Sequence, residues 1–227
     1  MSRAILPGCI LALLLCATLP AHASGILLDF RGLKDQEAVD NFYNGGTGGD
    51  GSTRGYNFGI TFSSNTLALK SFLQAGSGNF VTPPLGAPAI FFGASNGIMN
   101  SSAGFNTGIQ FFYAAGATAT VTVYSGVNGQ GSALATITLS PNAGGSCGGA
   151  SFCTWTSASL GFTGTAESVV FHGSLPNQFG VSEVTVGSTQ SAIPEPSSFL
   201  LVGTGLVGLY GSARSRLARP PRSHLGG

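Results

Sequence analysis

Charged residues are scarce in this chain of 227 residues, where Asp, Glu, Lys and Arg together make up 7% of the composition. None of them occurs between Ser71 and Ala166. A span of that length without charge argues against a solvated helix bundle and favours short strands joined by polar turns. Before Pro194 the acidic residues outnumber the basic ones, so we expect no nucleic-acid partner, which would need a basic patch.

Histidine is nearly absent as well, since only His172 of the three histidines lies between residues 24 and 192. A lone imidazole does not supply a serine triad or a zinc site. Glycoside hydrolysis needs two facing carboxylates, and the early acidic residues fall in predicted turns and loops. The sequence therefore predicts a non-catalytic protein, with a cryptic extracellular hydrolase as the least favoured alternative.

The N-terminus has the three parts of a secretory signal peptide. Arg3 gives a positive start, Ile10 to Leu15 is an apolar stretch, and Ala21, His22 and Ala23 fit a small-x-small cleavage site. We therefore predict a signal peptide at residues 1–23 and an exported domain at residues 24–192.

Two of the four cysteines, Cys9 and Cys16, lie in that predicted signal peptide. Cys147 and Cys153 are then the only pair in a domain that reaches an oxidising compartment. The glycines between them allow the chain to turn back, so we predict a disulfide between Cys147 and Cys153. Its short loop limits the gain in stability to about 2 kcal/mol.

The exported domain shows the alternation of apolar and polar residues that is typical of half-buried strands. Val121 and Val123 alternate with threonines, and Ile137 and Leu139 do the same. Residues 37–43 form either one short helix or an irregular turn. We predict an all-β fold, a β-sandwich of jelly-roll type. The predicted strands are residues 26–30, 57–62, 67–69, 89–92, 109–114, 120–125, 134–139, 160–162, 168–172 and 179–186.

Three aromatic residues fall in loops or at strand ends, namely Tyr43, Tyr56 and Trp155. Rings at such positions can stack on sugars, which makes them candidate ligand residues. The alternative is ordinary, partly buried packing.

The last predicted strand changes parity, with apolar residues at 179 and 181 and then at 184 and 186. Either a bulge lies there or Glu183 points inward, where it must be paired, protonated or bound to a cation. Asp29 raises the same question in the first strand, which is often the neighbour of the last one in a jelly roll. Two alternatives stay open: Asp29 and Glu183 share a Ca²⁺ ion, or Asp29 pairs with Arg31 or Lys34 while Glu183 faces solvent. No other cofactor is expected.

Three features follow one another at the C-terminus: a Pro-Glu-Pro tripeptide, an uncharged run and an arginine cluster. The run of seventeen residues would span roughly 26 Å as a helix, near the lower limit for crossing a bilayer. Arginines behind such a helix stay cytoplasmic, which places the preceding domain outside. The features occupy Pro194, Glu195 and Pro196, then Ser197 to Ala213, then Arg214, Arg216, Arg219 and Arg222.

This tail resembles the PEP-CTERM sorting signal, with residues 193–227 as the sorting region and its apolar run as a hydrophobic helix. The resemblance implies export, transient residence in the inner membrane, recognition by an exosortase and cleavage near Pro194. The processed protein would then be at the cell surface or extracellular. An ordinary C-terminal membrane anchor is the alternative, and it also places the domain outside.

Phrases such as Phe42 to Gly46 and Val123 to Gly129 resemble the bodies of many PEP-CTERM proteins. That resemblance implies a sandwich similar to carbohydrate-binding modules and association with extracellular polysaccharide or biofilm matrix, without a known activity. We therefore expect an exported, exosortase-processed, non-catalytic surface protein. A carbohydrate- or calcium-binding module is the alternative.

Overall fold

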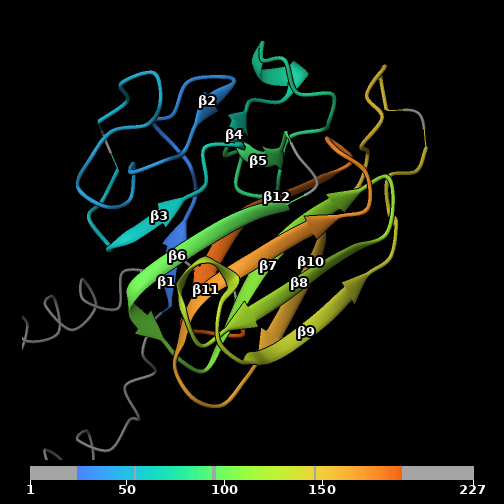
Figure 1. Ribbon diagram of the computed structural model, residues 1–227. Helices are drawn as coiled ribbons and strands as arrows, with labels where there is room; N and C mark the ends of the chain where they lie inside the picture. The colour runs from blue at the N-terminus through green and yellow to red at the C-terminus, as the bar shows by residue number, and fades with distance from the viewer. Residues whose placement is uncertain (1–24, 54, 94–95, 146, 191–227) are drawn as a thin grey trace, which may run out of the picture. The chain divides into compact units, whose positions relative to one another are not determined.

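The computed structural model describes residues 25–53, 55–93, 96–145 and 147–190 (Figure 1). The predicted signal peptide and sorting region lie outside these residues. The described part is built from strands and two short 3-10 helices, η2 (Phe72–Gln74) and η3 (Val127–Gly129). The strands are β1 (Ile26–Leu28), β2 (Glu37–Ala38), β3 (Ile60–Phe62), β4 (Thr66–Leu69), β5 (Ala89–Phe92), β6 (Asn96–Phe105), β7 (Gly108–Ala115), β8 (Ala119–Tyr124), β9 (Ala133–Leu139), β10 (Thr156–Gly161), β11 (Ala166–Gly173) and β12 (Phe179–Val186).

These strands form two antiparallel sheets. The seven-stranded sheet has the order β10-β7-β12-β5-β4-β2, with β1 also paired to β12, and the five-stranded sheet has the order β3-β6-β11-β8-β9. From β5 to β12 the chain passes repeatedly between the sheets, so that β5-β12-β7-β10 in one sheet corresponds to β6-β11-β8-β9 in the other. This is the winding of a jelly roll, and the predicted β-sandwich is confirmed.

The central strand β12 is buried at all eight positions. Its first half pairs with β5, as in Val181 opposite Ile90, and its second half pairs with β1, as in Val184 opposite Leu28. The first and last strands of the domain are therefore neighbours. On the other sheet β8 alternates buried and half-buried residues, because only one of its faces meets the core.

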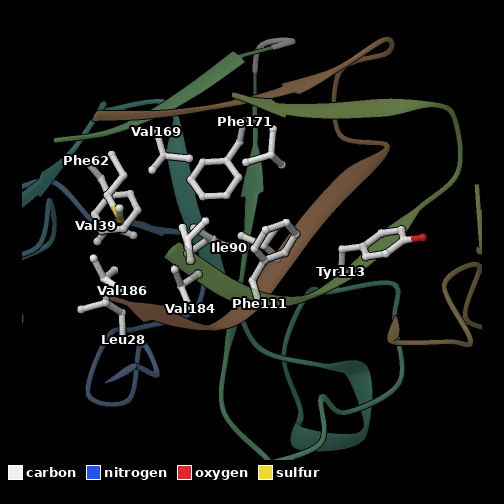
Figure 2. Close-up of a cluster of buried hydrophobic side chains, with 14 of the residues drawn as sticks. Leu28, Val39, Phe62, Ile90, Phe111, Tyr113, Val169, Phe171, Val184 and Val186 are labelled. Atoms are coloured by element: carbon white, nitrogen blue, oxygen red, sulfur yellow. The ribbon is translucent and has the colours of Figure 1, made fainter. Parts of the chain in front are cut away.

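The main core lies between the two sheets (Figure 2). Phe171 of β11 faces Phe111 and Ile90 of the seven-stranded sheet, with the rings of Phe171 and Phe111 6.0 Å apart. A second cluster contains Phe80, Phe91 and Phe152. Phe91 belongs to β5 but points to the opposite face of the sheet from Ile90, which lies in the main core. Successive residues of a strand point to opposite faces, so loops cover the outer face of this sheet too.

The structure corrects one expectation about the strands and decides between two alternatives in another segment. The longest strand, β6, was predicted as no element, because its sequence of Asn, Ser and Gly has the composition of a loop. Of the two alternatives for residues 37–43, a short helix or an irregular turn, the structure has the turn: Glu37 and Ala38 form β2, and turns follow.

Candidate functional site

A polar cavity of about 290 Å³ lies where β3 and β6 meet η3. Its lining carries side-chain amides and hydroxyls and no charged residue among the described ones. We call it the asparagine pocket; its lining residues are Asn44, Gly59, Thr61, Asn100, Ser102, Val127 and Asn128.

Two of these amides are held in place by each other. Asn100 on β6 donates from Nδ2 to Asn128 Oδ1 at 2.8 Å, and the main-chain N–H of Asn128 donates to Asn100 Oδ1 at 2.7 Å. Asn128 has a positive φ of 58°, a conformation that Asn tolerates better than most residues. Asn44 makes no side-chain hydrogen bond within the described residues, so its amide is free to pair with a ligand hydroxyl.

Three aromatic rings stack from the core to the surface. Their residues are close in sequence to Asn44 and Gly59 of the asparagine pocket. The ring of Tyr43 stacks on Phe58 at 6.1 Å, and Phe58 stacks on Tyr56 at 5.6 Å. Tyr56 is 74% exposed, so it presents its ring to solvent. A ring held flat by a stacked neighbour is suited to packing against a sugar.

Tyr43 itself is not at the surface, contrary to the position expected for a ligand residue. It is 2% exposed, and its hydroxyl oxygen accepts the main-chain N–H of Phe30 at 2.6 Å. Burial, reinforced by the charge of Asp29, raises the pKa of this phenol well above its ordinary value. The loop that carries Tyr43 folds over the sandwich, and the large ring completes the core.

Trp155 is half-buried rather than free. Its indole N–H donates to the carbonyl of Val81 at 2.8 Å, and its ring packs edge-on against Phe80 at 5.6 Å. These contacts fix the loop before β10 and occupy the polar atom of the indole.

Glu183 lies at a bulge in β12, where the register with β7 shifts between Ser182 and Thr185. Its φ is 54°, and its side chain is 2% exposed. The sequence offered a bulge or an inward carboxylate, and the structure contains both. The alternative in which Glu183 faces solvent is wrong, because the bulge turns the side chain under the loop that contains Leu85.

The Glu183 carboxyl has an incomplete set of partners. Oε1 accepts the N–H of Leu85 at 2.5 Å, and Oε2 accepts no hydrogen bond within the described residues. Burial raises the pKa of Glu183, while the Leu85 N–H and the charge of Arg31 oppose the rise and the charge of Asp29 adds to it. A protonated carboxyl at this position would be neutral.

Asp29 pairs with Arg31 at 3.5 Å, as one alternative from the sequence predicted. Its charge adds to the raised pKa of Glu183, and the register of β1 with β12, in which Leu28 lies opposite Val184, makes the two acids neighbours in topology. In the described ranges no group of three or more His, Cys, Asp or Glu residues is placed to hold a metal. A shared Ca²⁺ ion would have to take its remaining ligands from other oxygens.

Cys147 and Cys153 form the predicted disulfide, with their Cα atoms 5.7 Å apart. The bridge closes a loop in the charge-free span, and the loop is joined to the sandwich by the pairing of Phe152 with Phe80. This prediction is confirmed.

His172 is exposed on β11, with Nδ1 beside the side-chain oxygen of Asn96. No helix of the described residues is both long and apolar enough to span a bilayer. The residues of the predicted sorting motif, Pro194, Glu195, Pro196, Arg214 and Arg216, lie outside the described part.

The asparagine pocket was not predicted from the sequence. Asn128 lies in the short 3-10 helix η3 between predicted strands, and Asn100 lies in the unpredicted strand β6. The one available signal was the density of Asn beside Gly, which indicates turns as readily as ligand contacts.

A family model of the PEP-CTERM protein-sorting motif matches residues 192–216. The matched segment contains the Pro-Glu-Pro tripeptide and the first two arginines of the cluster. The resemblance seen in the tail is thereby confirmed.

Several solved structures are similar in fold. The K2 cleaved adhesin domain of Lys-gingipain is 12% identical, with a TM-score of 0.48, over 72% of this chain and 98% of that one. CsCBM6-3 from Clostridium stercorarium, solved with cellobiose, is 17% identical, with a TM-score of 0.35, over 56% and 84%. A family 29 carbohydrate-binding module is 14% identical, with a TM-score of 0.38, over 61% and 92%. At these TM-scores the likenesses carry no inference about a ligand. No curated protein matches the sequence.

Proposed function

We propose that this chain, which carries a PEP-CTERM protein-sorting motif at residues 192–216, is exported, processed by an exosortase and displayed at the surface or released. In this proposal residues 1–23 direct export, residues 24–192 are the mature domain, and residues 193–227 are the sorting region. The sorting motif is the single observation that carries the proposal.

Processing is tested by the intact mass of the protein recovered from its native host. We expect the segment from about Pro194 onward to be missing. A variant with Pro194→Ala and Pro196→Ala should keep its full C-terminus, because the tripeptide is altered while the apolar run is unchanged. A wild-type mass that includes Phe199 to Gly227 would leave only the membrane-anchor alternative.

We further propose that the mature domain binds extracellular polysaccharide without catalysis, as a component of an exopolysaccharide or biofilm matrix. The asparagine pocket supports this, because amide groups can both donate to and accept from sugar hydroxyls. The exposed ring of Tyr56 gives a stacking surface.

A glycan array with the secreted protein tests this binding. The matched variants are Asn44→Ala and Tyr56→Ala, which remove an unpartnered amide and an exposed ring without opening the core. Each should weaken binding to the recognised glycan, and Thr138→Ala on the distant edge strand β9 should not. Retained binding in both variants would place the polysaccharide elsewhere, and hydrolysis of the glycan would support the hydrolase alternative instead.

Calcium is a second candidate ligand, favoured by the buried and unpartnered Oε2 of Glu183 beside Asp29. Thermal unfolding at pH 8, first with EDTA and then with added Ca²⁺, is the test. The site is supported if added Ca²⁺ raises the unfolding midpoint of the wild type and if the midpoint with Ca²⁺ is lower in the Asp29→Asn variant. An unchanged midpoint removes it, since a ligand that binds only the folded state must stabilise it.

A further inference from the structure

Three basic side chains gather around a second cavity. Arg31 and Lys34 from the loop after β1 meet Lys70 at the end of β4 around a volume of about 450 Å³. Gln74, Gly86 and Pro88 also line the cavity, and no acidic residue is among the described residues of its lining. We call this the cationic pocket.

The acidic residues of the same region are turned away onto main-chain donors. Asp35 accepts the N–H groups of Lys70 at 2.7 Å and Ser77 at 2.8 Å, one on each oxygen. Glu37 is fully buried and accepts the N–H groups of Lys34, Asp50 and Ser52. Their carboxylates are therefore committed to holding the loops, and they leave the ammonium groups of the pocket without ion-pair partners.

The two lysines are held without being neutralised, and Arg31 keeps one ion pair, with Asp29. Arg31 donates from Nη2 to the carbonyl of Leu85, and Lys34 donates from Nζ to the carbonyl of Asp50. Carbonyl oxygens orient a cation but do not cancel its charge. Within the described residues, Lys70 finds no acceptor for its ammonium group, and Asp29 beside Arg31 is the one ion-pair partner of the three.

The wall that contains Leu85 and Gly86 is fixed from three sides. Leu85 donates its N–H to Glu183 and accepts a hydrogen bond from Arg31 at its carbonyl. Gln74 Nε2 donates to the carbonyl of Gly86 at 2.9 Å. The cavity is therefore shaped before any ligand arrives, which lowers the entropy cost of binding.

We propose that the cationic pocket binds the carboxylate of an acidic polysaccharide, such as one built from uronic acids. This inference rests on the proposed function and names the chemical class of its ligand. Ammonium groups attract a carboxylate as point charges, and a cavity of this volume accommodates a sugar unit. Exposed apolar side chains adjoin the lining in sequence, Leu73 at 64% and Leu85 at 40%, and offer contacts for the C–H face of a sugar ring.

The test compares polygalacturonate with its methyl ester, which has the same sugar without the charge, by isothermal titration calorimetry on the secreted protein. We expect binding to polygalacturonate, about tenfold weaker binding to the ester, and weakening of the first with added salt. Lys70→Gln should lower the affinity for polygalacturonate about five- to tenfold and leave the affinity for the ester unchanged. Lys34→Gln should act in the same direction.

The matched control is Thr138→Glu, which changes the net charge by the same amount on the exposed edge of the other sheet and should leave both affinities unchanged. Equal binding of polygalacturonate and ester, or an equal loss in Thr138→Glu and Lys70→Gln, overturns the inference and leaves polysaccharide binding intact. Binding of neither polymer nor of any neutral glycan on the array overturns both. Binding of inorganic phosphate alone, abolished in Lys70→Gln, overturns the inference in favour of a free-anion site.

Discussion

The domain buries two glutamates, Glu37 and Glu183, which differ in their hydrogen-bond donors and in the direction of their pKa shifts. Glu37 in β2 is 0% exposed and receives four hydrogen bonds: from the N–H groups of Lys34 at 2.6 Å, Asp50 at 3.0 Å and Ser52 at 3.0 Å, and from the Ser52 hydroxyl at 2.6 Å. Glu183 in β12 is 2% exposed and receives one hydrogen bond from the described residues, from the N–H of Leu85. Burial acts to raise both pKa values, but the donors around Glu37 outweigh it and lower its pKa, whereas the pKa of Glu183 is raised.

The difference shows what each carboxylate does in its surroundings. Around Glu37 the chain runs in loops, where no neighbouring strand accepts the main-chain N–H groups, and an ionised carboxylate takes that place. Around Glu183 the main-chain N–H and C=O groups of the strands pair with one another. The bulge therefore leaves Oε2 of Glu183 without a hydrogen-bond donor among the described residues. Burial therefore does not determine the charge of a glutamate; the number of donors aimed at it does.

The largest expected effect comes from breaking the Glu37 set. Glu37→Gln keeps the shape but replaces one accepting oxygen with an amide that meets donors, so N–H groups in the loop are left unsatisfied. We expect the free energy of unfolding at pH 7 to fall by about 3 kcal/mol, measured by urea denaturation.

Glu167→Gln is the control for this prediction, because Glu167 is only half-buried and makes no hydrogen bond within the described residues. It should change stability by less than about 0.5 kcal/mol. Equal effects of the two substitutions would mean that the four hydrogen bonds around Glu37 contribute nothing specific.

The roles of the two glutamates were not equally visible in the sequence. The parity change at residues 182 and 183 offered a bulge or an inward Glu183 as alternatives, because strand geometry is local, and the structure contains both. Glu37 gave no such signal, since its strand has two residues and its partners Asp50 and Ser52 are thirteen and fifteen positions away. Long-range loop closure of this kind is not encoded in a periodic pattern.

The same limit explains the candidate sites. The jelly roll follows from the alternation in strands such as β8, and the disulfide follows from the position of Cys147 and Cys153 within an exported domain. The asparagine pocket and the cationic pocket are assembled from loops and from β6, whose Gly, Ser and Asn residues carry no apolar period. Tyr43 was misplaced because a loop that folds over a core has no sequence signature of burial.

The charge-free loop between Cys147 and Cys153 is held by a disulfide, whereas the loops around Glu37 are held by hydrogen bonds to a carboxylate. Replacing both cysteines by alanine should lower the free energy of unfolding by about 2 kcal/mol, less than Glu37→Gln, because the closed loop is short. Urea denaturation under oxidising conditions measures the change. Reduction of the wild type should give the same loss in free energy of unfolding. A loss in the double alanine variant well above that of the reduced wild type would mean that the cysteine side chains also contribute packing.

Glu183→Gln should have the opposite sign to Glu37→Gln. An ionised Glu183 is a buried carboxylate with one donor among the described residues, whereas the neutral amide can still accept from Leu85. We expect a gain of about 1 kcal/mol in the free energy of unfolding at pH 8 and no gain at pH 4, where the carboxyl is protonated. A loss at pH 8 as large as that of Glu37→Gln would show that a charged Glu183 is stabilising, as a bound cation would make it.

The pH dependence follows from the two directions of shift. The pKa of Glu37 is lowered below 4.5, so its stabilisation is present above that pH and is lost as the pH falls through the lowered value. The pKa of Glu183 is raised above 4.5, so its cost appears as the pH rises from that value through the raised one. The stability difference between wild type and Glu37→Gln should therefore shrink in acid, and that between wild type and Glu183→Gln should grow toward alkaline pH. Parallel curves for all three proteins would contradict the comparison.

The smallest effect concerns the charges around Glu183. Asp29 raises the pKa of Glu183 and Arg31 lowers it, each less than burial does. Asp29→Asn should therefore lower the pKa of Glu183, and Arg31→Gln should raise it. Asn at position 29 keeps the oxygen that accepts the N–H of Arg31, so the turn is retained. A ¹³C NMR titration of the Glu183 side-chain carboxyl gives the pKa directly. Shifts of the same sign in the two variants would mean that a change in the Leu85 loop, rather than the charge itself, sets the protonation of Glu183.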